Sequence, residues 1–216
     1  MKVFLSIGAG PGMGLETAER FAREGYRIVL SARSLEKVKA LAQELQAKGY
    51  TAEARAVDAG SPASVASLVQ GVLKEHSNID VLHYNAAALH KDTVLSQPIE
   101  TFNTDLAVNI GGAFASIQTV LPSMTKQASG SILLTGGGFG LLPPPDFLSI
   151  GIGKAGIRAL ANGLFEDFKS KGVHIATVTV CMFVDPGSKD AKAVAEHFWT
   201  LHSQPKTDWT WEIQHG

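Results

Sequence analysis

The stretch that decides the fold is Gly8-Ala9-Gly10-Pro11-Gly12-Met13-Gly14, which directly follows a short apolar run at residues 2–7. An apolar helix face begins immediately after it, with Leu15, Ala18 and Phe21-Ala22. A glycine-rich turn between a strand and a helix lets the backbone approach a pyrophosphate group, and the helix N-terminus supplies free N–H groups. The order of strand, turn and helix therefore predicts a nucleotide-binding unit at the start of the chain.

Short runs rich in β-branched residues alternate with longer segments of helical period along the rest of the chain. The expected strands are residues 2–7, 26–32, 51–57, 79–85, 131–135, 173–180 and 208–214. The expected helices are residues 13–24, 34–48, 62–76, 99–126, 150–170 and 189–203. This alternation predicts an α/β fold with a doubly wound, Rossmann-like parallel sheet of about seven strands and helices on both faces. No repeat or linker interrupts it, so residues 1–216 are expected to form a single domain.

Composition narrows the classes of protein and partner. Hydrophobic residues make up 45% of the 216 residues, enough for a large core, which excludes a disordered chain. Nineteen basic and twenty acidic residues leave a net charge of −1, which disfavours nucleic acid or an anionic membrane as a partner. The single cysteine, Cys181, forms no internal disulfide and favours a cytoplasmic setting. The seven histidines show no metal-ligand spacing, so no metal site is expected.

The end of the second expected strand indicates which nucleotide the turn would bind. Ala32-Arg33 stands where an acidic residue would hold ribose hydroxyls, and a guanidinium there suits the 2′-phosphate of NADP(H). The residues therefore favour NADP(H) over NAD(H). They disfavour an S-adenosylmethionine-dependent methyltransferase, which usually also carries an acid just before the glycine-rich loop, where Ser6 stands. The alternative for Arg33 is a solvated residue that starts a helix.

A series of short motifs occurs in an order and spacing that together form a recognisable pattern. The motifs are the glycines of Gly8-x-x-x-Gly12-x-Gly14, Asp58-Ala59, Tyr84-Asn85-Ala86-Ala87, Val108-Asn109-Ile110, Gly130-Ser131-Ile132-Leu133-Leu134 and Lys154. Each motif alone is weak evidence. Together they make the sequence resemble the short-chain dehydrogenase/reductase family along nearly its whole length.

The resemblance implies an NADP(H)-dependent oxidoreductase that acts on a carbonyl or alcohol and assembles as a homodimer or homotetramer. The cofactor-binding residues it implies are Gly8, Gly12, Met13, Gly14, Arg33, Asp58, Ala59, Asn85, Ala86, Ala87, Lys154 and Val184. It also implies catalytic roles for Asn109 in a proton relay and for Lys154 at the nicotinamide ribose. The family's oligomers are often built on the fourth helix and the helix that starts near Ile150.

Two positions depart from the family pattern. Ile150 stands where the family has its catalytic tyrosine, four residues before Lys154, and Gly137 stands where it has a serine. Carbonyl reduction needs a proton donor and a partner for the charge that develops on oxygen, and neither residue has a side-chain donor. Lys154 would replace the tyrosine if desolvation lowers its pKa. Substitutes that fit by position alone are Ser149, Asp146 and Tyr84. The rival interpretation is a catalytically silent NADP(H)-binding sensor or scaffold.

Overall fold

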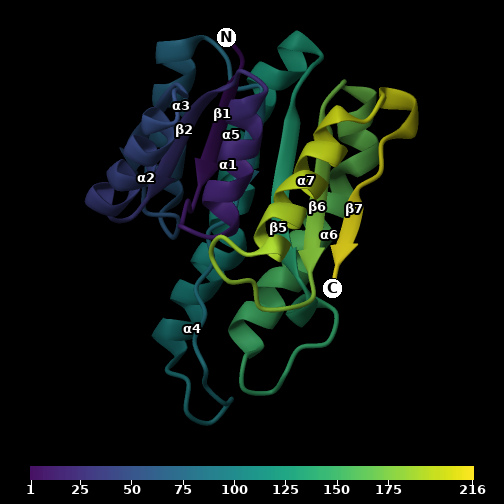
Figure 1. Ribbon diagram of the computed structural model, residues 1–216. Coiled ribbons are helices and arrows are strands. Elements are labelled where there is room, and N and C mark those ends of the chain that lie inside the picture. The colour runs from purple at the N-terminus through teal and green to yellow at the C-terminus, as the bar shows by residue number, and fades with distance from the viewer.

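Seven parallel strands form one sheet in the computed structural model, which describes residues 1–216 (Figure 1). In chain order they are β1 Val3–Ile7, β2 Arg27–Ala32, β3 Ala52–Ala56, β4 Val81–Tyr84, β5 Ser131–Gly137, β6 His174–Val180 and β7 Glu212–His215. Their order in the sheet is β3-β2-β1-β4-β5-β6-β7. The direction of winding reverses between β1 and β4, and in such sheets the ligand crevice lies at the carboxyl ends of the strands on either side of this point.

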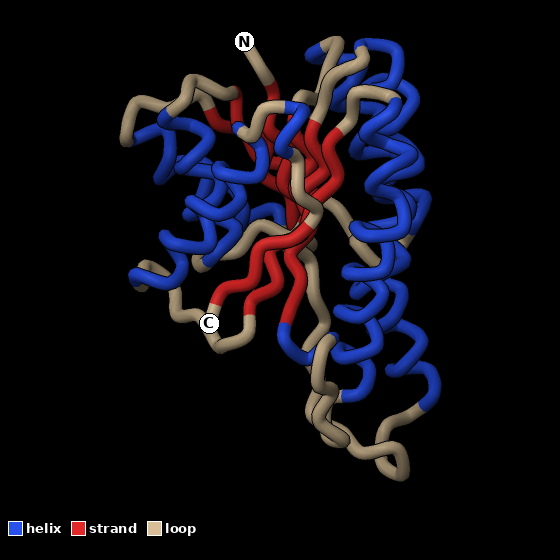
Figure 2. Tube along the Cα trace, turned by 90° about the vertical axis from the view of Figure 1, so that its right-hand side faces the viewer, coloured by secondary structure: helices blue, strands red, loops and turns tan.

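Helices cover both faces of the sheet (Figure 2). Their bounds are α1 Met13–Arg23, α2 Leu35–Ala47, α3 Pro62–His76, α4 Ile99–Leu106, α5 Gly112–Gln127, α6 Leu148–Ser170 and α7 Lys189–Ser203. The buried side chains of α1, α2 and α7 form one core with one face of the sheet. Those of α3, α5 and α6 form a second core with the other face. The fold is therefore the doubly wound, Rossmann-like sheet that the sequence predicts.

The alternation of side chains along β1 shows how the sheet serves both cores. Val3, Leu5 and Ile7 belong to the core under α3, α5 and α6, whereas Phe4 belongs to the core under α1, α2 and α7. Every residue of β1 is buried. Strands of parallel sheets that are covered on both faces need such a mainly apolar sequence, because successive side chains point to opposite faces.

The predicted helix 99–126 is wrong in one respect, because a π-helical turn at Ala107–Gly111 separates α4 from α5. Asn109 lies within this turn, and its side chain bonds to the backbone of Ala88. Single π-helical turns insert an extra residue into a helix and often occur at functional sites. The turn therefore allows Asn109 to face the loop after β4 while the helix continues.

The predicted last strand, 208–214, is also displaced, because β7 spans Glu212–His215. The backbone N–H of Thr210 donates to the side-chain oxygen of Gln204 over 3.0 Å. The ring of Trp209 stacks on His174, with centroids 4.5 Å apart. These side-chain contacts hold residues 209 and 210 outside the sheet, so strand pairing starts later than the apolar alternation indicates.

Two segments extend beyond the carboxyl edge of the sheet, where Figure 1 shows α4 and its neighbouring loops at the bottom. One segment leads from β4 to α4 and the other from β5 to α6. The backbone N–H of Asp92 donates to the carbonyl of Asp146 over 2.9 Å, which joins the two. Both segments therefore lie beyond the carboxyl ends of the strands and supply walls for a cavity there. No helix in the structure has the length and apolar character needed to cross a membrane.

Candidate functional site

The glycine-rich turn has the geometry of an anion-binding loop. Gly8 has φ +87°, and a Cβ atom there would lie 2.3 Å from the backbone nitrogen of Ala86, so only glycine fits. The N–H groups of Gly8 and Ala9 both donate to the carbonyl of Ser31 over 2.9 Å. The N-cap of α1 is Gly12, which offers no side chain to bond the first N–H groups of the helix. The helix therefore begins with donors and a positive dipole end directed at this turn.

A cavity of about 270 Å³ lies beside the turn, between the ends of β1, β2 and β4. Its lining includes the predicted cofactor residues Gly8, Arg33, Ala59 and Asn85-Ala86-Ala87. Arg33 is exposed at its edge, at the end of β2. The structure therefore brings these residues together around one cavity, and the exposed Arg33 side chain lies at its edge.

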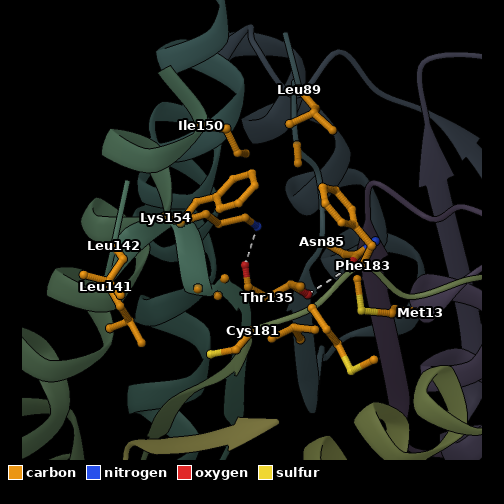
Figure 3. Close-up of a pocket in the computed structure, with 17 residues that line it drawn as sticks. Met13, Asn85, Leu89, Thr135, Leu141, Leu142, Ile150, Lys154, Cys181 and Phe183 are labelled. Carbon is orange, nitrogen blue, oxygen red and sulfur yellow. Dashed lines mark hydrogen bonds between the residues drawn. The ribbon is translucent and has the colours of Figure 1, made fainter. Parts of the chain in front are cut away.

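A second cavity of about 540 Å³ adjoins the first and shares Asn85 and Ala87 with it. Figure 3 shows the side chains that line this second cavity. It lies above the ends of β4, β5 and β6. The lining residues are Met13, Asn85, Ala87, Leu89, Thr135, Gly136, Gly137, Gly138, Phe139, Leu141, Leu142, Ile150, Lys154, Val180, Cys181, Met182 and Phe183. Small-molecule sites commonly have volumes of ~300–1,000 Å³ and few polar groups, which this cavity resembles.

Lys154 is the one basic side chain in the lining of the larger cavity. It extends from α6, and its ammonium donates to the carbonyl of Thr135 over 2.6 Å. The residue as a whole is half-buried, but its ammonium is removed from water and has no carboxylate partner within 4.0 Å. Burial therefore lowers the pKa of Lys154 to about 8.

The two positions that are expected from the sequence to depart from the family pattern lie beside this lysine. Gly137 and Ile150 both line the same cavity as Lys154. A Cβ atom built on Gly137 would lie 3.2 Å from Cγ of Lys154. The cavity wall near Lys154 therefore includes glycine at position 137 and isoleucine at position 150, and neither residue has a hydrogen-bond donor in its side chain.

A directed chain of hydrogen bonds runs behind the cavity. Asn85 Nδ2 donates to the carbonyl of Gly8 over 2.9 Å, so Asn85 Oδ1 accepts from the Thr135 hydroxyl over 2.9 Å. With its one hydrogen used, the Thr135 hydroxyl accepts from His83 Nε2 over 3.2 Å, and His83 Nδ1 accepts from Ser6 over 3.2 Å. Burial, together with the positive charge of Lys154, lowers the pKa of His83 to about 3. The neutral Nε2–H tautomer therefore fits this chain.

His83 and Thr135 are functional candidates that the sequence analysis missed. The available signal was a polar residue, His83, inside the otherwise apolar run Val81–Tyr84. Nothing local in the sequence pairs it with Thr135, which follows about fifty residues later on the neighbouring strand. The chain of bonds ties the turn at Gly8 to the residue whose carbonyl holds Lys154.

Asn109 is placed beside the cavity but does not line it. Its Oδ1 accepts from the backbone N–H of Ala88 over 2.7 Å, and its Nδ2 donates to the Ala88 carbonyl over 3.0 Å. Both polar atoms of the side chain are therefore used to hold the loop that follows β4. The geometry assigns Asn109 a positioning role, and leaves its side chain with no group directed into the cavity.

The other predicted residues surround the turn or support it. Gly14 packs closely, because a Cβ atom there would lie 3.1 Å from Cα of Ala9. Met13 lines the larger cavity, whereas Val184 is half-buried against the core under α1, α2 and α7. Asp58 Oδ1 accepts from the N–H of Gly60 over 3.0 Å, so its carboxylate shapes the turn after β3.

The side chains considered as substitutes for a tyrosine are not in the cavity lining. The Tyr84 hydroxyl donates to the carbonyl of Val108 over 2.5 Å, and burial raises its pKa. The Ser149 hydroxyl is buried and donates to Asp105 over 2.7 Å. Asp146 does not line the cavity either. Of the candidates, only Lys154 presents a titratable group there.

Comparisons with known proteins agree with this architecture. Residues 2–194 match the family model described as short chain dehydrogenase. An uncharacterized oxidoreductase of Staphylococcus saprophyticus is 27% identical over 190 residues, 88% of this chain and 81% of the relative. A 2,5-dichloro-2,5-cyclohexadiene-1,4-diol dehydrogenase of Sphingobium indicum is 27% identical over 177 residues, 82% of this chain and 71% of that protein.

Solved structures give the same result for the fold. A short-chain dehydrogenase from Rhodopseudomonas palustris is similar with a TM-score of 0.91 and 27% identity, covering 100% of this chain and 98% of that one. A metagenomic short-chain oxidoreductase in complex with NADP has a TM-score of 0.92 and 24% identity, covering 99% of this chain and 96% of that one.

Proposed function

The chain belongs to the short-chain dehydrogenase family, and on that premise we propose that it is an NADP(H)-dependent oxidoreductase of a carbonyl or alcohol that uses Lys154 in place of a tyrosine. The observation that carries the proposal is the buried ammonium of Lys154 in the wall of the larger cavity. Its pKa of about 8 lies near neutral pH, which is where a proton donor works best.

The two adjoining cavities fit NADP(H). The turn at Gly8 leaves no room for a side chain, and α1 begins without a side-chain cap, so Gly8, Gly12, Met13 and Gly14 would hold the pyrophosphate. The remaining cavity-lining residues that would hold the cofactor are Arg33 at the 2′-phosphate, Ala59 at the adenine, and Asn85, Ala86, Ala87 and Lys154 toward the nicotinamide end. Asp58 and Val184 line neither cavity, and their roles rest on the family resemblance alone. When bound, the cofactor supplies or accepts the hydride.

Lys154 would provide the proton that balances this hydride. In the reduction of a carbonyl, the N–H bond of the Lys154 ammonium breaks as a proton moves to the substrate oxygen, while the hydride adds to the carbonyl carbon. The lysine is left as a neutral amine, and alcohol oxidation runs the same step in reverse. The Thr135 carbonyl fixes the position of the lysine nitrogen, and Asn109 holds the loop that lines the opposite wall.

A silent NADP(H)-binding sensor or scaffold is the rival, because Gly137 and Ile150 have no hydrogen-bond donor in their side chains. A methyltransferase is disfavoured because neither of its usual ribose-binding acids is present. Ser6 stands in place of the first and is buried against His83, and Arg33 stands in place of the second. The first test is calorimetry with NADPH, NADH and S-adenosylmethionine, followed by a screen for consumption of NADPH by carbonyl compounds. Binding of NADPH with turnover supports the proposal. Binding without any turnover contradicts it and supports the rival.

We propose in addition that the protein is a homodimer or homotetramer in the cytoplasm. The helix α6 glycines Gly151, Gly153 and Gly156 pack against their own chain, so they do not argue for a dimer. The support comes instead from Phe114 on α5 and Ile152 on α6, which are apolar and exposed. Light scattering that reports only the monomer mass of 22.9 kDa at micromolar concentration would contradict it.

A further inference from the structure

The lining of the larger cavity points to a class of substrate, and this inference rests on the proposed function. Besides Lys154, no side chain in the lining carries a charge at neutral pH. Two of the polar ones are already occupied, because the Thr135 hydroxyl donates to Asn85, and Asn85 donates to Gly8. A substrate would therefore find Lys154 as its one charged partner, with the Cys181 thiol and mainly apolar surface elsewhere (Figure 3).

The walls of the cavity are aromatic and branched aliphatic. Phe139 stacks on Phe147 with ring centroids 5.3 Å apart, and it meets Phe183 edge-on at 6.0 Å. Leu142 is 82% exposed and Phe183 is 75% exposed, although both are large apolar residues. Apolar side chains that rim a cavity and remain open to water gain by contact with an apolar ligand.

We propose that the substrate is an uncharged, apolar ketone or secondary alcohol, with a ring or branched body, and not a carboxylate- or phosphate-bearing compound. Lys154 is the only charged donor in the lining, and this explains the exclusion of anions. A substrate carboxylate would pair with the Lys154 ammonium and take the proton donor away from the reacting oxygen. A second anionic group would have no partner in the cavity, and burial of an unpaired charge is unfavourable.

The test compares three ketones as substrates of the full-length protein with NADPH. The probes are 4-phenylbutan-2-one, 5-methylhexan-2-one and 4-oxopentanoate, all of which are methyl ketones with the same two-carbon spacer. The last two differ by replacement of an isopropyl group with a carboxylate of similar shape. The value of kcat/KM for NADPH oxidation is expected to be at least about tenfold higher with 5-methylhexan-2-one than with 4-oxopentanoate, because the carboxylate pairs with Lys154 in place of the reacting oxygen, and it is expected to be highest with the phenyl ketone.

A matched pair of variants tests where the probes bind. Leu142→Glu adds a charge at the rim and is expected to weaken binding of 4-phenylbutan-2-one by about tenfold. Leu95→Glu makes the same change at a leucine that is 98% exposed and does not line the cavity, and it is expected to leave binding unchanged. Equal weakening by both variants would overturn the assignment of the probe to this cavity.

The outcomes separate this inference from the proposed function. Affinity for NADPH is measured first, and its absence would overturn the proposed function itself. If NADPH binds and is oxidised but 4-oxopentanoate is the preferred probe, the proposed function stands and the apolar substrate class is wrong.

Discussion

The Lys154 ammonium donates a hydrogen bond of 2.6 Å to the Thr135 carbonyl. This carbonyl is its only hydrogen-bond partner, and the ammonium has no carboxylate partner. The lysine is therefore held in place without an opposite charge that would keep its proton bound. A buried cation without a carboxylate loses its proton more readily than one in water. This relationship links the fold to the chemistry proposed for the site.

The rate of carbonyl reduction is expected to depend on pH through Lys154. Its pKa is about 8, so kcat/KM for reduction is expected to be flat at lower pH and to fall above about pH 8, where the proton is lost. Alcohol oxidation needs the neutral amine and is expected to rise over the same range. Lys154→Arg keeps the positive charge but does not titrate there, so its residual rate is expected to show no break. A wild-type profile without a break near pH 8 would contradict the role of Lys154.

NADPH is expected to bind more tightly than NADH because of Arg33, which is exposed beside the smaller cavity. A charge-assisted contact with the 2′-phosphate is worth ~1.5–3 kcal/mol, or roughly ten- to a hundredfold in affinity. Calorimetry on the wild type and Arg33→Ala measures this preference, which the variant is expected to lose. Equal affinities for the two cofactors in the wild type would show that Arg33 is only a solvated residue.

Restoring the family's tyrosine and serine is expected to raise turnover on simple carbonyls. Gly137→Ser with Ile150→Tyr adds two donors to the wall beside Lys154, a change worth ~10²–10⁴-fold if they act as positioned catalysts. The new Cβ at position 137 would lie 3.2 Å from Cγ of Lys154, so the flexible lysine must shift slightly. Gly137→Ala with Ile150→Phe adds nearly the same bulk without hydroxyls and serves as the control.

The double substitution is informative only if its cofactor site survives, so NADPH affinity is measured in each variant. Addition of Lys154→Ala to the double variant is expected to abolish the gain. Brisk turnover of the wild type that persists in Lys154→Ala would show that another residue supplies the proton.

The buried hydrogen-bond chain behind the cavity is expected to support the glycine-rich turn proposed to bind the cofactor. Thr135→Val keeps the shape of the side chain but removes the hydroxyl between His83 and Asn85. Two buried polar groups then lose a partner, at a cost of ~1–3 kcal/mol each in the free energy of unfolding. NADPH affinity is expected to fall as well, because Asn85 holds the Gly8 carbonyl. Thr135→Ser keeps the hydroxyl and is expected to retain both the wild-type stability and the wild-type NADPH affinity. A defect in this variant as large as that of Thr135→Val would argue against the role of the hydrogen-bond chain.

The parts of the site that the sequence predicted depend on local order along the chain. The turn at Gly8 is recognisable because a strand, glycines and a helix follow one another directly. The hydrogen-bond chain from Ser6 through His83 to Thr135 was not predictable in this way. These residues lie on β1, β4 and β5, which are neighbours in the sheet but far apart in the sequence.

The π-helical turn escaped prediction for a similar reason. Helical periodicity continues through residues 99–126, and the extra residue at Ala107–Gly111 is recognisable only once Asn109 meets the backbone of Ala88. The lowered pKa of Lys154 likewise depends on the walls that surround it, which come from several separate segments. Sequence reasoning identified Lys154 as a candidate, and the structure supplies the burial that its proposed role requires.

Transfer of deuterium from NADPH deuterated at C4 of the nicotinamide to a ketone tests the central claim most directly. The protein is incubated with the labelled cofactor and 4-phenylbutan-2-one, and the alcohol product is examined by mass spectrometry. The account predicts deuterium on the carbinol carbon with the wild type, and a loss of at least about a hundredfold in rate with Lys154→Met. The account would be contradicted if the protein binds NADPH but transfers no deuterium to this or any other ketone between about pH 6 and about pH 9.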